Sequence, residues 1–279
     1  SIPTLTGYAR TYANVGKTKN FGYDLTFNFV PVRTKDFEWN IGVNAAYSRN
    51  EIVSLANGKE DDPANGWFIG ESTNSIYTYE SAGLWKEEDR ADMEKFNANG
   101  HDFQIGMARP VDQNGDYKID ANNDRTIVGH YDPRWTLGLN TNFTYKGWDL
   151  GIQLYGRMGF KYYDSSVWVG GRYNVRDYDY YNENNKNAAH PKPIYDEGGK
   201  DAYYNETYLK NGSYLKIRNI SLGYTFPNRL LTHTGLSALR MYAQIKNPGY
   251  IFSGCKTLDL DTYSNTYNSG FTFGLNLSF

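Results

Sequence analysis

Apolar and small polar residues alternate strictly over the last ten residues of the chain. Because successive side chains of a β-strand point to opposite faces, this alternation predicts a strand with one apolar and one small polar face. Such a strand fits a soluble β-sandwich, whose apolar face would meet a protein core, or a membrane barrel, whose apolar face would meet lipid. The apolar positions are Phe271, Phe273, Leu275, Leu277 and Phe279.

The same alternation recurs upstream and predicts about eight strands in all. Within the strand expected at 214–226, the apolar parity changes: Leu215 and Ile217 are on one parity, Ile220 and Leu222 on the other. This change predicts a β-bulge near Arg218. The expected strands cover residues 2–13, 21–29, 39–47, 135–145, 148–154, 214–226, 239–245 and 270–279.

The connections between these strands differ in length in a regular way. If the strands run alternately down and up, the short turns fall at one end and the long segments at the other. The short turns are 31–37, 146–147 and 227–237, and the long segments are 49–133, 160–212 and 248–269. Outer-membrane barrels have short periplasmic turns and long external loops, so this asymmetry favours a transmembrane antiparallel β-barrel over a soluble β-sandwich.

Composition agrees with a barrel and excludes other classes. The 279 residues are 39% hydrophobic and 16% aromatic, with a mean hydropathy of −0.69. No apolar run is long enough for a transmembrane helix, whereas only alternate residues of a barrel strand meet lipid. The net charge of −2 gives no basic surface for nucleic acid. The single Cys255 excludes an internal disulfide framework.

The residues expected on the polar face also bear on the size of the barrel. They are mostly Gly, Ser, Thr and Asn, which would leave the lumen of an eight-stranded barrel hollow, although such lumens are normally filled by side chains. A larger barrel, of which these are only some strands, fits better. The first residues of the chain, Ser1-Ile2-Pro3, lack the pattern of a signal peptide, and the strand pattern favours a piece of a longer protein.

Five segments of the chain carry recognisable motifs. They include the acidic segment from Asp112 to Asp120, the Lys146-Gly147 turn with its flanks, and the alternating C-terminus; the segments are residues 14–22, 112–129, 145–150, 213–224 and 271–279. As a set they resemble the SusC/RagA group of TonB-dependent outer-membrane transporters of Bacteroidetes. The stretch Lys246-Asn247-Pro248-Gly249 departs from the Gln-Asn pair usual in the family.

The resemblance implies that residues 1–279 are the C-terminal part of a 22-stranded barrel, without the plug domain and N-terminal strands, and that 49–133 and 160–212 are extracellular loops. It implies TonB-driven import of oligosaccharides or oligopeptides across the outer membrane, beneath a SusD-like surface lipoprotein. TonB would act through the absent N-terminal part, and Phe279 would serve as an outer-membrane insertion signal. The alternatives are a soluble carbohydrate-binding β-sandwich protein and a passive porin.

The acidic segment also suggests a metal site. Asp112, Asn114, Asp116 and Asp120, followed by Asp124, resemble the start of a calcium loop, in which oxygens converge on a hard cation. The glycine position differs from that of an EF-hand. The alternative is an Asx-rich turn whose carboxylates bind backbone amides.

Catalysis is not expected, because the four histidines are scattered singly and no nucleophile, base and orienting group can be assembled from spacing. Aromatic residues of the long segments could instead stack on sugars or pack on peptide side chains, or they could simply hold the loops together. The candidate substrate-binding residues are Trp67, Phe68, Trp168, Tyr173, Tyr178, Tyr180 and Tyr181.

Overall fold

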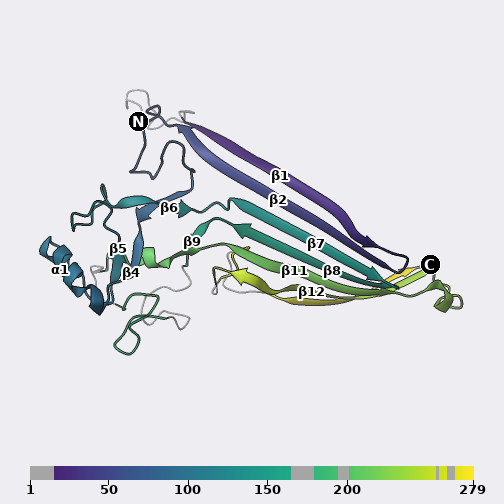
Figure 1. The fold of residues 1–279 in the computed structure, drawn as a ribbon. Coiled ribbons are helices and arrows are strands. Elements are labelled where there is room, and N and C mark those ends of the chain that lie inside the picture. The colour runs from purple at the N-terminus through teal and green to yellow at the C-terminus, as the bar shows by residue number, and fades with distance from the viewer. Residues whose placement is uncertain (1–15, 165–178, 194–200, 256–257, 263–267) are drawn as a thin grey trace, which may run out of the picture.

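A single large antiparallel sheet dominates the computed structural model, which describes residues 16–164, 179–193, 201–255, 258–262 and 268–279. The sheet has seven strands in the order β1-β2-β7-β8-β11-β12-β13 (Figure 1). Their bounds are β1 Lys17–Arg33, β2 Phe37–Ser54, β7 Trp135–Tyr145, β8 Trp148–Met158, β11 Tyr214–Thr225, β12 Ala238–Ser253 and β13 Gly270–Ser278. The all-β antiparallel architecture expected from the alternation is therefore confirmed, while the first expected strand, 2–13, lies outside the described residues.

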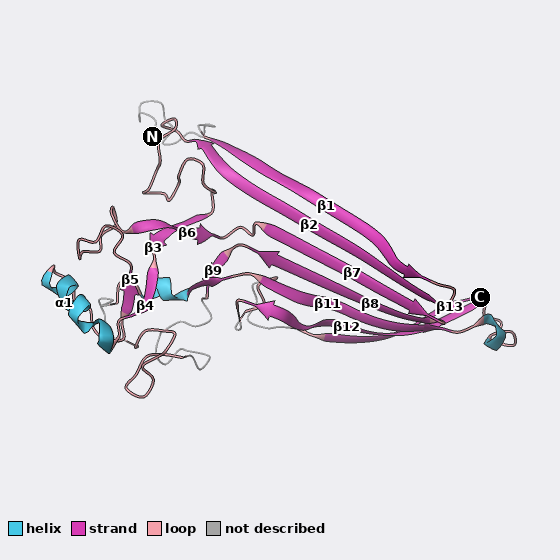
Figure 2. Cartoon of the chain, viewed as in Figure 1, coloured by secondary structure: helices cyan, strands magenta, loops and turns pink. Residues whose placement is uncertain are grey.

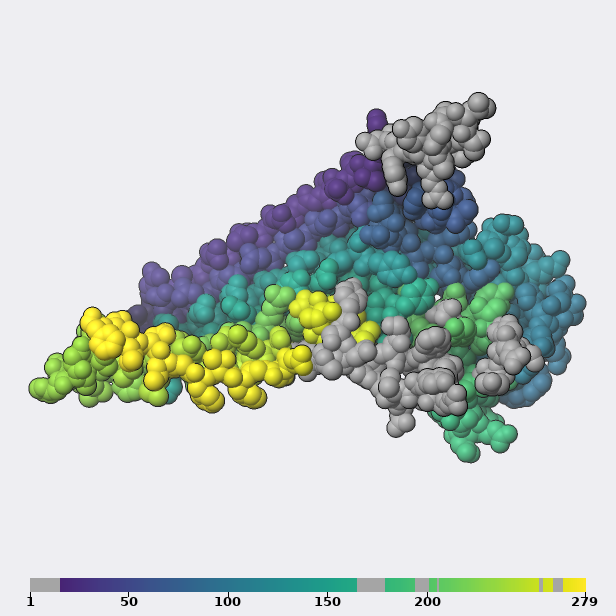
Figure 3. Space-filling view, turned by 180° about the vertical axis from the view of Figure 1, so that it is seen from behind, coloured from purple at the N-terminus to yellow at the C-terminus, as the bar shows by residue number. Residues whose placement is uncertain are grey.

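Each strand pairs with the next long strand along the chain. The short connections β1–β2, β7–β8 and β11–β12 gather at the end where the C-terminus lies, and the long connections gather at the other end with α1 (Figures 1 and 2). The predicted sorting of the connections is thus confirmed. Seen from behind, β1 in purple and β13 in yellow occupy opposite edges of the sheet (Figure 3).

The strand registers place residues of one kind side by side across the sheet. One row is apolar and consists of Trp39, Phe143, Leu150, Leu222, Ala243 and Phe273. The row beside it is small or polar and consists of Asn40, Asn142, Gly151, Ser221, Gln244 and Thr272. We call the two sides the apolar face and the polar face. Many large side chains of the apolar face are exposed, 58% for Phe27 and 83% for Phe273.

The predicted bulge is present. The register of β11 shifts between Ile217 and Asn219 against both of its neighbours, which returns the apolar side chains to one face. Four strands are longer than expected: β1 covers Lys17–Arg33, β2 continues to Ser54, β8 continues to Met158, and β12 runs through Pro248 to Ser253. In β12 the apolar alternation is interrupted at Asn247, whose φ is 48°. The backbone pairing of the strand continues beyond the point at which the alternation ends.

Beyond the long-loop end of the sheet, the chain forms a smaller unit with its own core. Three two-stranded antiparallel sheets and one helix build it, namely β3 Ser75–Tyr79 with β6 Arg125–His130, β4 Ser81–Leu84 with β5 Ala108–Pro110, β9 Lys161–Tyr163 with β10 Leu209–Asn211, and α1 Arg90–Ala98. Short 3-10 helices lie at Glu87–Asp89, Tyr204–Tyr208 and Asn228–Leu230. No helix in the described part of the chain is long and apolar enough to cross a membrane.

The core of this unit, which we call the loop core, surrounds the fully buried Trp85. Helix α1 contributes Met93 and Phe96, which lie three residues apart on one face of the helix. Arg109 lies over the Trp85 ring at 4.6 Å and pairs with Asp89 at 2.6 Å. The loop core consists of Trp85, Met93, Phe96, Phe103, Met107 and Ile119.

Candidate functional site: the polar face and the long-loop end

The polar face carries most of the sheet's side-chain hydrogen bonding. Gln244 donates to Asn219 at 2.6 Å, and Thr26 donates to Asn44 at 3.0 Å. Across the middle of the sheet one row contains Asn28, Gly42, Asn140, Gln153, Asn219, Lys246 and Gly270. This face can therefore hydrogen-bond water or a polar ligand along its whole width.

An ion pair lies on the polar face near the short-turn end. Arg240 on β12 donates through Nε to Asp149 on β8 at 2.9 Å, with a second contact through its terminal nitrogen. The strand between them carries Gly223, where a Cβ would collide with both partners. Glycine at this position thus lets the two charges meet across an intervening strand.

At the opposite end of the polar face, residues 258–262 fold back onto β11; we call them the anchor segment. The Nζ of Lys216, a residue only 1% exposed, lies 2.6 Å from Asp261 and 3.6 Å from Asp259. Arg218 lies 3.1 Å from Asp261, and the Tyr250 hydroxyl donates to Asp259 at 2.5 Å. Lys216 pairs in register with Tyr155 and Tyr250.

The anchor segment is also held by apolar packing. Its Leu260 is completely buried in a second cluster that contains Phe160, Tyr162, Tyr214 and Cys255. Burial alone would raise the pKa of Asp261, but hydrogen bonds and charge interactions with Lys216 and Arg218 outweigh it and leave this pKa below its ordinary value. The anchor segment is therefore a charged loop fixed over the polar face.

The candidate calcium residues form hydrogen bonds within their own loop. Asp112 accepts from the amides of Gly115 and Tyr117, and Asp120 accepts from those of Asn122 and Asn123. Asp124 is buried and accepts from the amides of Gln113 and Asp120, while Asn114 and Asp116 bind each other and backbone amides. Among the described residues no group of three or more His, Cys, Asp or Glu side chains could hold a metal ion.

These contacts are the ones that the Asx-rich turn predicts, because each carboxylate satisfies backbone donors. Calcium binding stays a prediction. A calorimetric titration of the intact protein with Ca²⁺ after chelation would test it directly.

The candidate substrate-binding aromatics have different surroundings. Trp67 is 43% exposed and lines a groove together with Lys17, Thr18 and Ile52, whereas Phe68 packs on Tyr77 with ring centroids 4.6 Å apart. Tyr180 is 39% exposed. Tyr181 lies against Gly106 beside the loop core, and Trp168, Tyr173 and Tyr178 lie outside the described residues.

Two carboxylates in the loop unit, the buried Asp201 and the partly buried Glu206, carry no sequence signal of their own. Asp201 accepts from the Ala108 amide at 2.9 Å, and Glu206 accepts from the Thr78 hydroxyl at 2.7 Å. Burial raises the pKa of both carboxyls. Neither these residues nor Lys216 and its partners were singled out from the sequence, because their contacts join segments far apart along the chain.

Comparisons with known proteins identify homologues of this chain. No family model matches. The chain is 27% identical to the TonB-dependent receptor SusC of Bacteroides thetaiotaomicron, over 99% of this chain and 28% of that protein. It is 26% identical to TonB-dependent receptor P3 of Formosa agariphila, over 100% of this chain and 30% of that protein. The chain is homologous to the SusC/RagA-type TonB-dependent receptors. The expected resemblance is thereby confirmed.

Solved structures agree with this homology. The structure of the RagAB peptide transporter matches with a TM-score of 0.71 and 25% identity, over 100% of this chain and 31% of that chain. The RagAB peptide importer in its open-open state matches with a TM-score of 0.72 at 24% identity. The chain of this SusC/RagA homologue thus spans about 30% of the length of its relatives. Homology also confirms the outer-membrane location, and the relatives are receptors and transporters rather than enzymes.

Proposed function

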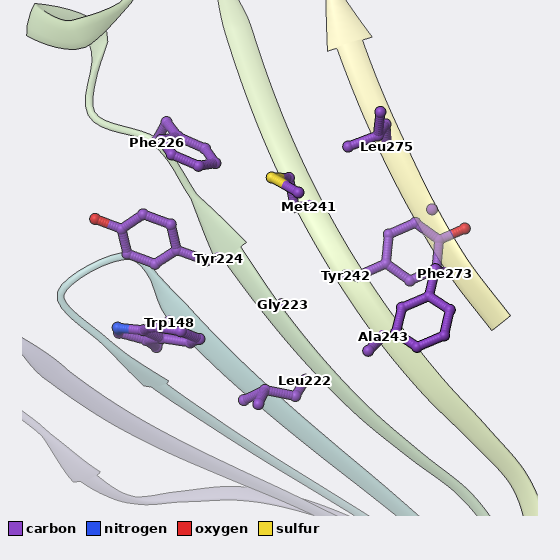
Figure 4. A pocket seen from close by; sticks show the side chains of 11 residues that line it. Trp148, Leu222, Gly223, Tyr224, Phe226, Met241, Tyr242, Ala243, Phe273 and Leu275 are labelled. Atoms are coloured by element: carbon purple, nitrogen blue, oxygen red, sulfur yellow. The ribbon is translucent and has the colours of Figure 1, made fainter. Parts of the chain in front are cut away.

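We propose that this chain forms the C-terminal portion of the barrel wall of a TonB-dependent importer. The main observation behind this proposal is that apolar residues and polar residues form separate rows, in register across all seven strands. The apolar face would meet lipid and the polar face would line the lumen, as in other outer-membrane barrels. An apolar hollow on the sheet, shown in Figure 4, would accommodate acyl chains; its lining includes Trp148, Leu222, Met241, Phe273 and Leu275.

Strand length supports this assignment. Strand β7 has 11 residues and begins at Trp135 and ends at Tyr145. At about 3.4 Å per residue and a tilt of about 40°, such a strand crosses about 26 Å, close to the height of the apolar band of outer-membrane barrels. The rings of Trp148 and Tyr224 also pack against each other at the short-turn end, tilted by 47° with centroids 4.8 Å apart, where an interfacial aromatic girdle is expected.

The remaining architecture follows from the same physics. An open sheet edge is not tolerated in lipid, because its backbone groups would lack partners. We infer that β1 and β13 pair with further strands to complete a barrel of the 22-stranded size, with a plug domain elsewhere in the protein. The long segments 49–133 and 160–212 would then be extracellular.

Import would concern oligosaccharides or oligopeptides and would use a SusD-like lipoprotein as partner. Support comes from the homology to SusC and from the structural match to the RagAB peptide transporter. The exposed aromatics Trp67 and Tyr180 at the long-loop end would contact the substrate. Phe279, 90% exposed at the end of the apolar face, would serve in membrane insertion.

Uptake in cells with and without TonB tests the proposal. The intact protein should fractionate with the outer membrane, copurify with a lipoprotein, and support uptake of labelled oligomers that stops when TonB is deleted. Uptake that persists without TonB would favour the passive porin. Recovery from the soluble fraction without detergent would favour the carbohydrate-binding sandwich and overturn the barrel.

A further inference from the structure

Charges are distributed unevenly over the polar face. The polar-face positions of β7 are Thr, Gly or Asn, and β1 contributes Asp24 at such a position. On the other half of the sheet, β8, β11 and β12 carry a series of cations. At the long-loop half of these three strands the polar-face cations are Arg157, Lys216, Arg218 and Lys246.

These four cations are only partly neutralised. Asp259 and Asp261 of the anchor segment pair with Lys216 and Arg218. Neither Arg157 nor Lys246 makes a salt bridge with any residue that the structure describes. Among the described residues, four positive charges against two negative ones leave about two positive charges without a salt-bridge partner on this part of the polar face. Asp24 does not offset them, because β1 is four strands from β11, about 19 Å at the usual strand spacing.

Arg218 and Lys246 are close neighbours at the bulge. Lys246 pairs in register with Asn219, the residue that follows Arg218, so the two backbones lie about 5 Å apart. The Arg218 guanidinium lies over the Tyr155 ring at 3.9 Å, which fixes its plane. Its side chain remains 46% exposed while one terminal nitrogen binds Asp261, so other donors of the guanidinium stay accessible.

Polar amides surround this pair. Gln153 lies in the same row as Asn219 and Lys246, and Gln244 donates to Asn219. A fixed guanidinium, an ammonium group and nearby amides are the groups that bind carboxylates and other oxyanions. We propose that this surface, centred on Arg218 and Lys246, binds a carboxylate or similar anionic group of the transported oligomer. The inference rests on the proposed import function and adds the charge class of the cargo.

Retention of matched acidic and neutral oligomers tests the proposal. The full-length transporter, immobilised in detergent, is offered a casein hydrolysate and, separately, a pectin hydrolysate. Half of each is methyl-esterified with a deuterated reagent, which neutralises carboxylates and marks the products by mass. The ratio of free acid to ester among retained oligomers is then measured by mass spectrometry for the wild type, Lys246→Gln and Arg157→Gln. Lys146→Gln, in the short turn at the other end of the sheet, is the matched control.

We expect the wild type to retain free acids in preference to esters in at least one hydrolysate. A preference in the casein hydrolysate indicates peptide cargo, and one in the pectin hydrolysate indicates uronide cargo. Each of Lys246→Gln and Arg157→Gln should lower that preference by about fivefold, the effect of one partly exposed ion pair, while Lys146→Gln leaves it unchanged. The anion-binding proposal is overturned if the wild type retains acid and ester in equal amounts, or if both variants keep the wild-type preference. Either result leaves the proposed import function standing. If no oligomer of either hydrolysate is retained, the proposed import function fails with it.

Discussion

Two adjacent residues in the middle of β7 offer a direct test of which face meets lipid. Leu139 lies in the apolar row between Val43 and Leu154, and Asn140 lies in the polar row between Gly42 and Gln153. Both are near the centre of the strand between Trp135 and Tyr145. The two positions therefore share strand and depth but differ in face.

An arginine at each position should have very different effects. At the bilayer midplane a lipid-facing arginine costs about 2–4 kcal/mol, whereas a substitution on the lumen side is tolerated. Leu139→Arg should therefore lower the free energy of unfolding by about 2–4 kcal/mol, roughly 30- to 1000-fold in the folding equilibrium. Asn140→Arg should change it by less than about 1 kcal/mol.

Urea titration of the full-length protein in lipid vesicles measures both values, with folded protein scored by its gel mobility before boiling. Leu139→Gln separates the effect of the charge from the loss of the leucine side chain, and should fall between the two arginine variants. The reasoning is refuted if Asn140→Arg destabilises the protein as much as Leu139→Arg, because the two faces would then be equivalent.

Three further outcomes are expected. Lys216→Met leaves the buried Asp259 without its cation and Asp261 with Arg218 alone. Breaking a buried ion pair costs about 3–5 kcal/mol, so the anchor segment should become protease-sensitive in intact membranes; unchanged protection would contradict the ion network. Trp85→Ala should cost about 3–5 kcal/mol and speed hydrogen exchange in α1 but not in β7. Burial raises the pKa of Asp201 and Glu206, so these carboxyls bind protons more tightly in the folded loop unit than in the unfolded one. The protection of the loop unit from hydrogen exchange should therefore rise as the pH falls from the raised pKa values toward about 4. A fall in protection over that pH range would contradict this.

The sheet could be predicted from the sequence because its determinants are local. Alternation at period two assigns each side chain to a face, and one parity change was enough to place the bulge at Arg218. Where the alternation failed, at Arg49 in β2 and Asn247 in β12, the strands continue because backbone pairing does not require amphipathic side chains.

The long-loop end could be predicted only in outline. The anchor segment depends on Lys216 meeting Asp259 and Asp261, and the loop unit depends on Asp201 reaching Ala108. Nothing in the local sequence distinguishes these carboxylates from solvated ones, because their partners are distant along the chain. The aromatic candidates for substrate binding could be picked out from the sequence. In the structure, however, Phe68 packs against Tyr77 and Tyr181 packs against Gly106.

The sequential order of the sheet has a consequence for how such a protein changes over evolution. Every long connection leaves one strand and returns to the strand beside it, as between Tyr47 and its register partner Trp135. Doubling the length of a flexible loop adds only about 0.6 kcal/mol of closure entropy, and the strand registers would not move. Segments such as 55–74 could therefore be lengthened, shortened or exchanged between relatives while the wall that carries them is inherited unchanged.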